Sequence, residues 1–326
     1  MHAARSPREL VLAAFAAIYF VWGATFLAIR YAVEAIPPLA LMGVRSVSAG
    51  VLLLGGARLL ARDGGFAWPT RRQWAHAAVA GVLLFGGSHG VLATAERRVP
   101  SGVAALAVST IPVWLVLLDA LRPGGARPTG RVVAGMLIGI AGVALLVGNG
   151  VGSARPADLL LLVGSALSWA AGSLYGRHAP RAESAPVHTA AQLLAGGAFL
   201  LAGSALLGEH GAAALAAAPP RALLALAFLV LFGSVITFTA YTWLLRVSTP
   251  ARVGTYAFVN PVVAVLLGWA VAGEALTPRL AGALVVVLVG VGLVVTAPRL
   301  EGAGMRKRLL AGGRARRVER FGWGDG

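Results

Sequence analysis

Two stretches decide the fold of this chain: VPSGVAALAVSTIPVWLVLLDAL (residues 99–121) and TPARVGTYAFVNPVVAVLLGWAVAGE (residues 249–274). Each is long and apolar enough to cross a bilayer core, which needs about 20 mainly apolar residues per helix. Each also carries one proline at its start and another near its middle. These prolines correspond in pairs, Pro100 with Pro250 and Pro112 with Pro261. Matched prolines in two apolar runs indicate that the two halves of the chain are related by duplication.

The rest of the chain supports an internal repeat. An offset of 147 residues places Trp22 on Trp169, with slips of a few residues toward the end of each half. Matched leucines and glycines are common by chance in so apolar a chain, whereas matched tryptophans are not. Other coincidences at this offset are Arg30 with Arg177, Gly50 with Gly197, Leu54 with Leu201, Phe85 with Phe232, and Gly86 with Gly233. Weak similarity of this kind predicts a duplicated membrane protein.

The composition also requires a membrane. With 58% hydrophobic and 12% charged residues and a mean hydropathy of +0.80, the chain lacks the polar surface of a water-soluble globule. Its apolar runs do not alternate with polar residues, which excludes a membrane barrel. We therefore predict an all-α integral membrane protein with ten transmembrane helices. The predicted helices span residues 10–29, 38–60, 74–95, 101–121, 131–149, 157–176, 187–207, 221–244, 251–272 and 280–297.

The number and charge of the helices predict the topology. Five helices per half is an odd number, so the second half begins on the opposite side of the membrane and the two five-helix repeats are inverted. Arginines concentrate on one set of loops, which predicts that this side and both termini are cytoplasmic, in a bacterial inner membrane. The predicted segments are a cytoplasmic N-terminal segment (1–9), the first repeat (10–149), the second repeat (155–297) and a basic cytoplasmic tail (298–326).

Several function classes are disfavoured. The net charge of +16 would suggest nucleic acid in a soluble chain, but here the arginines lie between and after apolar runs, so no nucleic-acid partner is predicted. The chain has no cysteine, no G-x-x-x-x-G-K-[ST] loop and no metal-ligand spacing among its six histidines. We therefore predict no cofactor, no metal site and no enzymatic activity, and expect any transport to be driven by gradients.

Specific residues resemble a known family, the EamA-type members of the drug/metabolite transporter superfamily. The resemblance covers roughly residues 13–148 and 157–296 and rests on the motifs Trp22-Gly23 in the first helix, Asn260-Pro261 in the ninth and Gly273-Glu274 after it. The first half departs from the last pattern, since Arg122-Pro123 stands where Gly-Glu is expected. The resemblance implies two five-helix repeats and transport of amino acids, related metabolites or amphiphilic drugs.

Arg45 is the most informative candidate for the binding site. It lies about 12 Å along its helix from Pro37, at ~1.5 Å per residue, which is deep yet within snorkelling range of the outer face. Buried ionisable groups in membrane helices are costly and often functional. Arg45 could bind a substrate carboxylate through its planar donor fork, or make a structural bond to helix carbonyls. Its repeat partner is Gln192, which keeps polarity but not charge.

Other candidates line the predicted centre of the bundle. His89 stands in the third helix, where it could relay protons or form a structural hydrogen bond. Pro112 and Pro261 interrupt corresponding helices, which is the best sequence indication of a transporter site, although each could simply shape packing. The remaining cavity candidates are Trp22, Thr25, Ser109, Trp114, Trp169, Ser173, Tyr241, Trp243, Tyr256 and Asn260. Some aromatic members could instead belong to an interfacial belt.

Together these features predict a secondary transporter that moves small metabolites or amphiphilic drugs by alternating access. Two inverted halves can exchange conformations and open a shared cavity to either side in turn. An integral-membrane enzyme and a non-transporting scaffold are the alternatives. The predicted partners are a small-molecule substrate and membrane lipid, while proton coupling and oligomeric state are left open.

Overall fold

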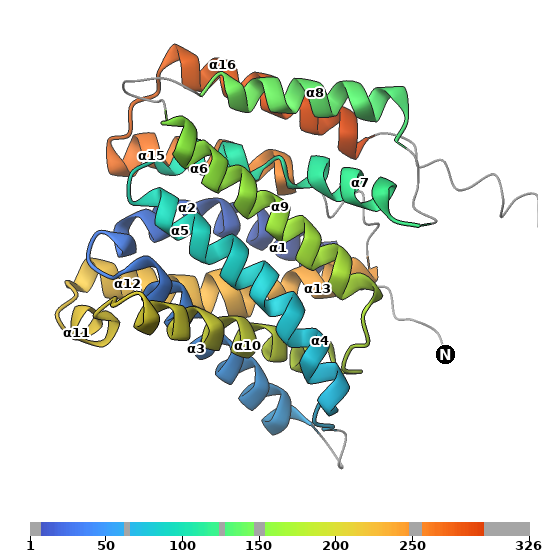
Figure 1. The fold of residues 1–326 in the computed structure, drawn as a ribbon, viewed down its shortest axis with the longest axis vertical. Helices are drawn as coiled ribbons and strands as arrows, with labels where there is room; N and C mark the ends of the chain where they lie inside the picture. Colours follow the sequence, from blue (N-terminus) through green and yellow to red (C-terminus); the bar gives the residue numbers. More distant parts are fainter. Residues whose placement is uncertain (1–7, 62–65, 124–127, 147–153, 248–255, 297–326) are drawn as a thin grey trace, which may run out of the picture.

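The computed structural model describes residues 8–61, 66–123, 128–146, 154–247 and 256–296. Nearly all of these residues are helical (Figure 1). Eight helices are long and apolar enough to cross a membrane, and two shorter apolar helices accompany them. The predicted all-helical membrane fold is therefore confirmed for the described part of the chain.

The helical elements follow the predicted windows closely. In chain order they are α1 (Arg8–Ala16), η1 (Ala17–Val21), α2 (Trp22–Val33), α3 (Pro38–Leu60), α4 (Arg71–Gly81), η2 (Val82–Gly90), α5 (Val91–Glu96), α6 (Ser101–Val108), α7 (Ile111–Leu121), α8 (Gly130–Ala144), α9 (Pro156–His178), α10 (Ala185–Leu206), α11 (Gly211–Ala216), α12 (Pro220–Phe228), η3 (Leu229–Ile236), α13 (Thr237–Val247), α15 (Tyr256–Ala272) and α16 (Pro278–Val295). Segments η1, η2 and η3 are π-helical and continue the α-helices on either side.

Helix starts follow local chemistry. Pro38, Pro156, Pro220 and Pro278 each stand in the first turn of a helix, where a missing N–H costs nothing. Thr70 accepts a hydrogen bond in a capping box at the start of α4. The first span runs to Val33, beyond the predicted end at residue 29, while the predicted limits at residues 149, 251 and 297 lie outside the described residues.

Two pairs of equivalent helices hold the halves together. Helix α3 packs on α10, and the two run in opposite directions (Figure 1). A Cβ on Gly50 would lie 2.8 Å from the side chain of Leu194, and a Cβ on Gly197 would lie 2.9 Å from the backbone nitrogen of Val47. Because Gly50 and Gly197 correspond at the repeat offset, the contact is nearly symmetric and depends on glycine at both places.

The second pair is α8 with α16, at the opposite edge of the bundle (Figure 1). A Cβ on Gly290 would lie 2.7 Å from the carbonyl oxygen of Gly135, and one on Gly142 would lie 2.8 Å from the backbone nitrogen of Val287. The Gly135-x-x-x-Gly139 sequence therefore serves packing within the chain.

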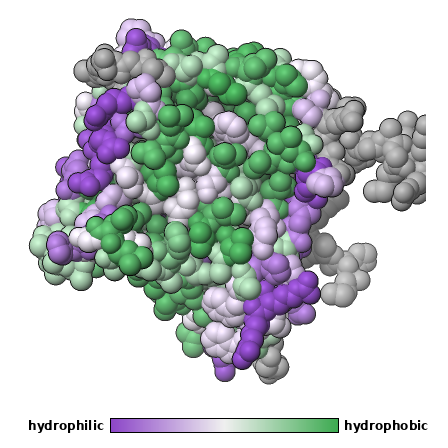
Figure 2. Space-filling model, viewed as in Figure 1, coloured by the Kyte–Doolittle hydropathy of each residue, from purple (hydrophilic) through white to green (hydrophobic). Residues whose placement is uncertain are grey.

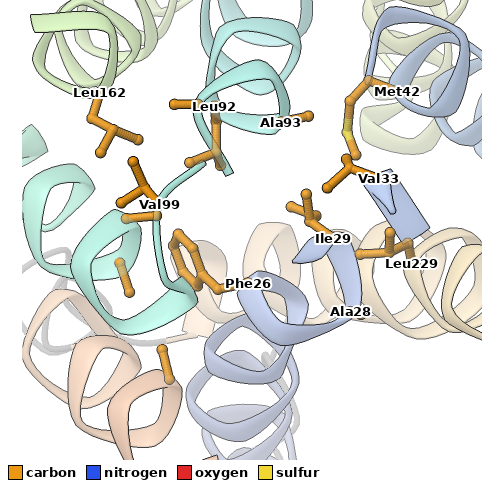
Figure 3. Packing of buried hydrophobic residues seen from close by; sticks show 14 of the residues in the cluster. Phe26, Ala28, Ile29, Val33, Met42, Leu92, Ala93, Val99, Leu162 and Leu229 are labelled. Carbon is orange, nitrogen blue, oxygen red and sulfur yellow. The ribbon is translucent and has the colours of Figure 1, made fainter. Parts of the chain in front are cut away.

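The interior is not packed evenly along the membrane normal. The end that we define as the packed end holds the connections 34–37, 97–100, 207–219 and 273–277. Figure 3 shows part of its core, where Phe26 of α2 points toward Val99, and Ile29 and Val33 lie between Met42 and Leu229. We define the opposite end as the aromatic end, where α3, α7, α9 and α13 stop.

An apolar surface surrounds the bundle. Figure 2 shows a broad hydrophobic area between hydrophilic patches at two opposite edges. Large apolar side chains exposed on the molecule include Leu12, Phe20, Leu160, Leu224 and Val285. Such a belt is unfavourable in water and fits a lipid-facing exterior.

Candidate functional site

Three π-helical segments interrupt spans of the described bundle. Segments η2 and η3 occupy corresponding places, since η2 begins at Val82 and η3 begins 147 residues later at Leu229. Segment η1 lies in the first span, directly before Trp22. π-Helical turns shift the backbone hydrogen-bond pattern and often occur at functional sites. Nothing in the sequence analysis predicted them.

Carbonyl oxygens of these segments accept hydrogen bonds from side chains of other helices. The indole Nε1 of Trp22 donates to the carbonyl oxygen of Gly233 in η3, at 3.1 Å. In the converse direction, the Ser168 hydroxyl of α9 donates to the carbonyl oxygen of Leu83 in η2, at 2.8 Å. The first span of each half thus binds the third span of the other half.

The third segment, η1, has a donor of its own. The Asn260 side-chain amide, with its nitrogen directed toward η1, donates to the carbonyl oxygens of Ile18 and Tyr19, at 3.2 and 3.0 Å. Asn260 directly precedes Pro261 in α15, which lacks an N–H of its own. The Asn-Pro motif therefore joins the ninth predicted span to the first.

Aromatic rings from both halves form a continuous cluster beside these segments. We define the aromatic cluster as Trp22, His89, Trp169, Phe238, Tyr241 and Tyr256. Its ring centroids are separated by 5.1 Å for Trp22–Tyr256, 5.3 Å for Trp22–Tyr241, 5.5 Å for Trp22–Phe238, 6.5 Å for Trp169–Phe238 and 5.2 Å for His89–Trp169. All six side chains are half-buried although they contact rings on neighbouring helices. Phe238, at the centre, was not among the predicted residues.

Arg45 is buried rather than snorkelling. Its side chain on α3 is 3% exposed, and its Nε donates to the hydroxyl of Ser234 in η3, at 3.1 Å. Among the described residues it forms no ion pair. Its repeat partner Gln192 does not join it, because the Gln192 amide lies 3.2 Å from Nε2 of His188 on its own helix. Arg45 and Gln192 are therefore both polar, but in the described part of the chain only Arg45 is hydrogen-bonded to another helix.

Glu96, the last residue of α5, was not among the predicted site residues. Its side chain is fully buried, and neither carboxyl oxygen has a hydrogen-bond partner among the described residues. The charged groups that act on it electrostatically are Arg30, Arg45 and Glu274. Glu96 falls one residue beyond the predicted window 74–95, and a charge within one turn of a window's end is the signal that identifies it.

The two helix-interrupting prolines meet at one small cavity. It has a volume of about 40 Å³, and its lining includes Phe26, Ser109, Pro112, Asn260 and Pro261. Pro112 follows a break between α6 and α7, whereas Pro261 lies inside α15. The structure therefore brings the predicted kinks together, as a site shared by both halves requires.

The polar candidates near this cavity mostly bond to their own helices. The Ser109 hydroxyl donates to the carbonyl oxygen of Leu106 at 2.7 Å, and the Thr25 hydroxyl donates to that of Trp22 at 2.6 Å. The Trp114 indole donates to the Thr110 hydroxyl at 3.2 Å. These bonds satisfy the groups locally and leave the rings to dominate the lining.

Two further candidates lie apart from the cluster's centre. Ser173 is half-buried on α9. Trp243 packs beside a small separate core of Ala14, Ile18 and Leu244 at the aromatic end.

His89, by contrast, belongs to the aromatic cluster. It stacks on Trp169, and its Nδ1 has no hydrogen-bond partner among the described residues.

A second, larger cavity is an apolar groove between α2 and α12. It measures about 450 Å³ and is lined by Leu27, Tyr31, Leu224 and Phe228 among others. The Arg221 guanidinium lies 3.5 Å from the centroid of the Tyr31 ring. The groove opens on the lipid-facing belt and is separate from the aromatic cluster.

Comparison with known proteins assigns the chain to a family. A model of the EamA-like transporter family matches residues 9–148 and 157–296. The chain belongs to this family. It is 40% identical to "Uncharacterized inner membrane transporter YedA" of Escherichia coli, over 80% of this chain and 82% of the relative. It is 26% identical to "Uncharacterized transporter YvbV" of Bacillus subtilis, over 91% and 94% of the two chains.

Solved structures give the same result for the fold. The alignment with one crystal structure covers 93% of this chain and 99% of the chain in that structure, with a TM-score of 0.61 and 25% identity.

A further sequence relative is "Protein PecM" of Dickeya dadantii, 28% identical over 76% of this chain and 80% of the relative.

The motifs that resemble the EamA family have structural explanations here. A Cβ on Gly23 would lie 2.6 Å from the Val263 side chain, so glycine lets α2 approach α15. Glu274 follows Gly273, whose φ is +66°, and its carboxylate accepts hydrogen bonds from the backbone nitrogens of Ser101 and Gly102 at 2.8 and 3.2 Å. A carboxylate at a helix N-terminus accepts hydrogen bonds from free N–H groups, and its negative charge interacts favourably with the positive end of the helix dipole. Glu274 thus caps α6 of the other half.

Proposed function

We propose that this protein is a secondary transporter that moves small metabolites, such as amino acids or related compounds, or amphiphilic drugs by alternating access. The observation that carries the proposal is the aromatic cluster, which both halves build and which stays half-buried within the bundle. Rings that contact several helices yet keep exposed faces can bind an apolar or amphiphilic solute. The packed end would close the bundle beside the aromatic cluster on one side of the membrane.

The topology belongs to the proposal. Ten spans in two inverted five-helix repeats are supported by the opposite directions of α3 and α10 and of α8 and α16 (Figure 1). We place the aromatic end and both termini in the cytoplasm of a bacterial inner membrane, because most arginines of the connections gather there. The segment limits 1–9, 10–149, 155–297 and 298–326 remain predictions, and the basic tail lies outside the described residues.

The substrate class follows from the lining. Aromatic faces suit a ring or an aliphatic chain, and Arg45 is a buried guanidinium whose described partners are neutral. An anionic group that displaced the Ser234 hydroxyl would give Arg45 a stronger, charge-assisted bond. We therefore favour solutes that combine an apolar body with a carboxylate. If the Arg45→Gln variant handled acidic and neutral solutes as well as wild type does, Arg45 would have only a structural role.

Counterflow tests the proposal in liposomes that contain purified protein and no ATP or other nucleotide. The probes are radiolabelled tryptophan, leucine and glutamate, together with a fluorescent amphiphilic dye. Wild-type liposomes preloaded with unlabelled solute should accumulate at least one labelled probe. Trp169→Ala should lower the rate about tenfold, since stacking contributes roughly 0.5–1.5 kcal/mol beyond burial. Trp68→Ala, outside the spans and 63% exposed, is the matched control.

Two outcomes would contradict the proposal. One is the absence of counterflow for every probe, including the dye. The other is chemical conversion of a probe, which would indicate an integral-membrane enzyme. Among the described residues no group of three or more His, Asp or Glu is placed to hold a metal ion.

A further inference from the structure

The buried carboxyl of Glu96 needs a physical explanation. Its side chain is 0% exposed, and both carboxyl oxygens lack a hydrogen-bond partner among the described residues. Burying an ionised carboxylate without partners is very costly, whereas a neutral acid is tolerated much more easily. Buried polar groups are nearly always satisfied, so an exception at this depth indicates a functional group.

The elements around Glu96 bring charges close without binding it. From α2, Arg30 donates to the backbone carbonyl oxygen of Glu96, at 2.7 Å, and not to its carboxyl. From α3, Arg45 donates to Ser234. After α15, Glu274 is held at the N-terminus of α6. On α9, Asp158 pairs with Arg98 at 2.7 Å, and on α6 the Ser101 hydroxyl is itself unpartnered within the described part of the chain.

We propose that the Glu96 carboxyl is the proton-binding site that couples solute movement to a proton gradient, an inference that rests on the proposed transport function. While the packed end is closed, the carboxyl is neutral. When that end opens, water reaches the carboxyl, its O–H bond breaks, and the proton passes to water. The resulting carboxylate then pairs with Arg45, which leaves Ser234. The packed end then closes and the aromatic end opens, the carboxylate leaves Arg45 and takes a proton from water that enters through the aromatic end, and its O–H bond forms again. One proton therefore crosses the bundle per cycle.

The same surroundings argue against a metal ion at this place. A sodium or divalent ion needs several oxygen ligands, and no group of three or more His, Asp or Glu in the described part of the chain is placed to hold one. A proton needs only the carboxyl itself. The arrangement also links proton and solute, because a solute carboxylate bound to Arg45 would compete with the Glu96 carboxylate for the same guanidinium.

Infrared spectroscopy of purified protein tests the proton site without any solute. Wild type should show the band of a protonated carboxyl that persists above the pH at which exposed carboxyls ionise. Glu96→Gln should remove this band, and Glu34→Gln, an exposed carboxyl at the same end, should keep it. If Glu96→Gln failed to give monodisperse protein, Glu96→Asp, which should shift the band, would replace it. Absence of the band in wild type, or its persistence unshifted in the Glu96 variant, would overturn the proposal.

Flux then tests coupling, with the probe found by counterflow. At equal pH on both sides, Glu96→Gln should retain counterflow, which reports the carrier alone. A gradient of one pH unit should drive up to about tenfold accumulation in wild type and in Glu34→Gln, since one proton per cycle carries a tenfold factor, and none in Glu96→Gln. Equal gradient-driven accumulation in wild type and Glu96→Gln would refute coupling at Glu96, whereas loss of counterflow in wild type would instead refute transport.

Discussion

Helices α6 and α7 belong to one predicted span, yet the two ends of that span differ sharply. Residues 101–107 of α6, at the packed end, are all buried, whereas residues 114–120 of α7, toward the aromatic end, are all half-buried. Both segments are strongly apolar, so hydropathy does not explain the contrast. It arises from packing, because α6 contacts α2, α9 and α15 while α7 mainly contacts α9. The bundle is therefore sealed at one end and looser at the other.

Polar contacts follow the same division. At the packed end, carboxylates hold helix N-termini: Glu274 binds α6, and Glu209 accepts a hydrogen bond from the backbone nitrogen of Ala40 in α3, at 2.9 Å. At the aromatic end, the described contacts between helices include His76 with Tyr175 at 2.6 Å and the Arg131 guanidinium, which donates to the Thr296 hydroxyl at 2.7 Å. Opening the packed end must therefore break charge-assisted bonds at two helix N-termini.

The largest effect should come from Gly81→Val. Gly81 and Gly196 bring the backbones of α4 and α10 into direct contact, and an added side chain would meet backbone atoms, which cannot yield. We expect little folded protein, measured as the monodisperse fraction after detergent extraction. Gly56→Val, at a glycine with open space around it, should fold normally. Normal folding of Gly81→Val would mean that the looseness of the aromatic end extends to α4 and α10.

Weakening the seal should have the next largest effect. Glu274→Ala removes the cap of α6, at a cost of about 1–3 kcal/mol, and should raise the population open at the packed end on the order of tenfold. The chain has no native cysteine, so a single Ala104→Cys, buried at 0% exposure, reports opening by its reaction with a membrane-impermeant maleimide. Glu34→Ala is the control. An unchanged labelling rate in Glu274→Ala would remove Glu274 from the seal.

Two arginine–aspartate pairs compare the ends directly. Arg98 binds Asp158, which is buried at the packed end, while Arg122 binds the more exposed Asp119 at the aromatic end, at 3.1 Å. Arg98→Gln should lower the free energy of unfolding by about 1–2 kcal/mol, because it leaves a buried carboxylate with only Arg155 at 3.6 Å. Arg122→Gln should cost about 0–0.5 kcal/mol. Thermal unfolding in detergent measures both, and equal losses would contradict the contrast.

Much of the fold could be predicted because the bilayer fixes helix length and composition. The convergence of Pro112 and Pro261 also followed from the repeat. The π-helical segments and their donors from distant helices, such as Ser168, could not be predicted, because neither leaves a hydropathy or spacing signal in the sequence. Glu96 was missed because hydropathy windows stop at charges, and Phe238 because a phenylalanine in an apolar run carries no distinguishing signal.

The repeat does not specify side-chain partners. Gln192 corresponds to Arg45 and keeps polarity but not charge, and the structure gives Arg45 a partner across the bundle and Gln192 a partner on its own helix. Corresponding positions in the two halves occupy equivalent places on the backbone but have different neighbours. Arg45 lies beside the Ser234 hydroxyl of η3, whereas Gln192 bonds to His188. Side-chain partners therefore had to come from the three-dimensional packing.

The smallest effect sharpens the comparison at the boundary between the ends. Trp22→Phe keeps a ring in the aromatic cluster but removes the hydrogen bond to the Gly233 carbonyl oxygen, which should lower the free energy of unfolding by about 1 kcal/mol. Trp169→Phe loses similar ring area and no hydrogen bond within the described structure, so the difference between the two variants isolates that bond. Thermal unfolding in detergent measures the difference. If the two variants were equally stable, Trp22 would not anchor the cluster to η3, and the aromatic cluster would belong to the looser end alone.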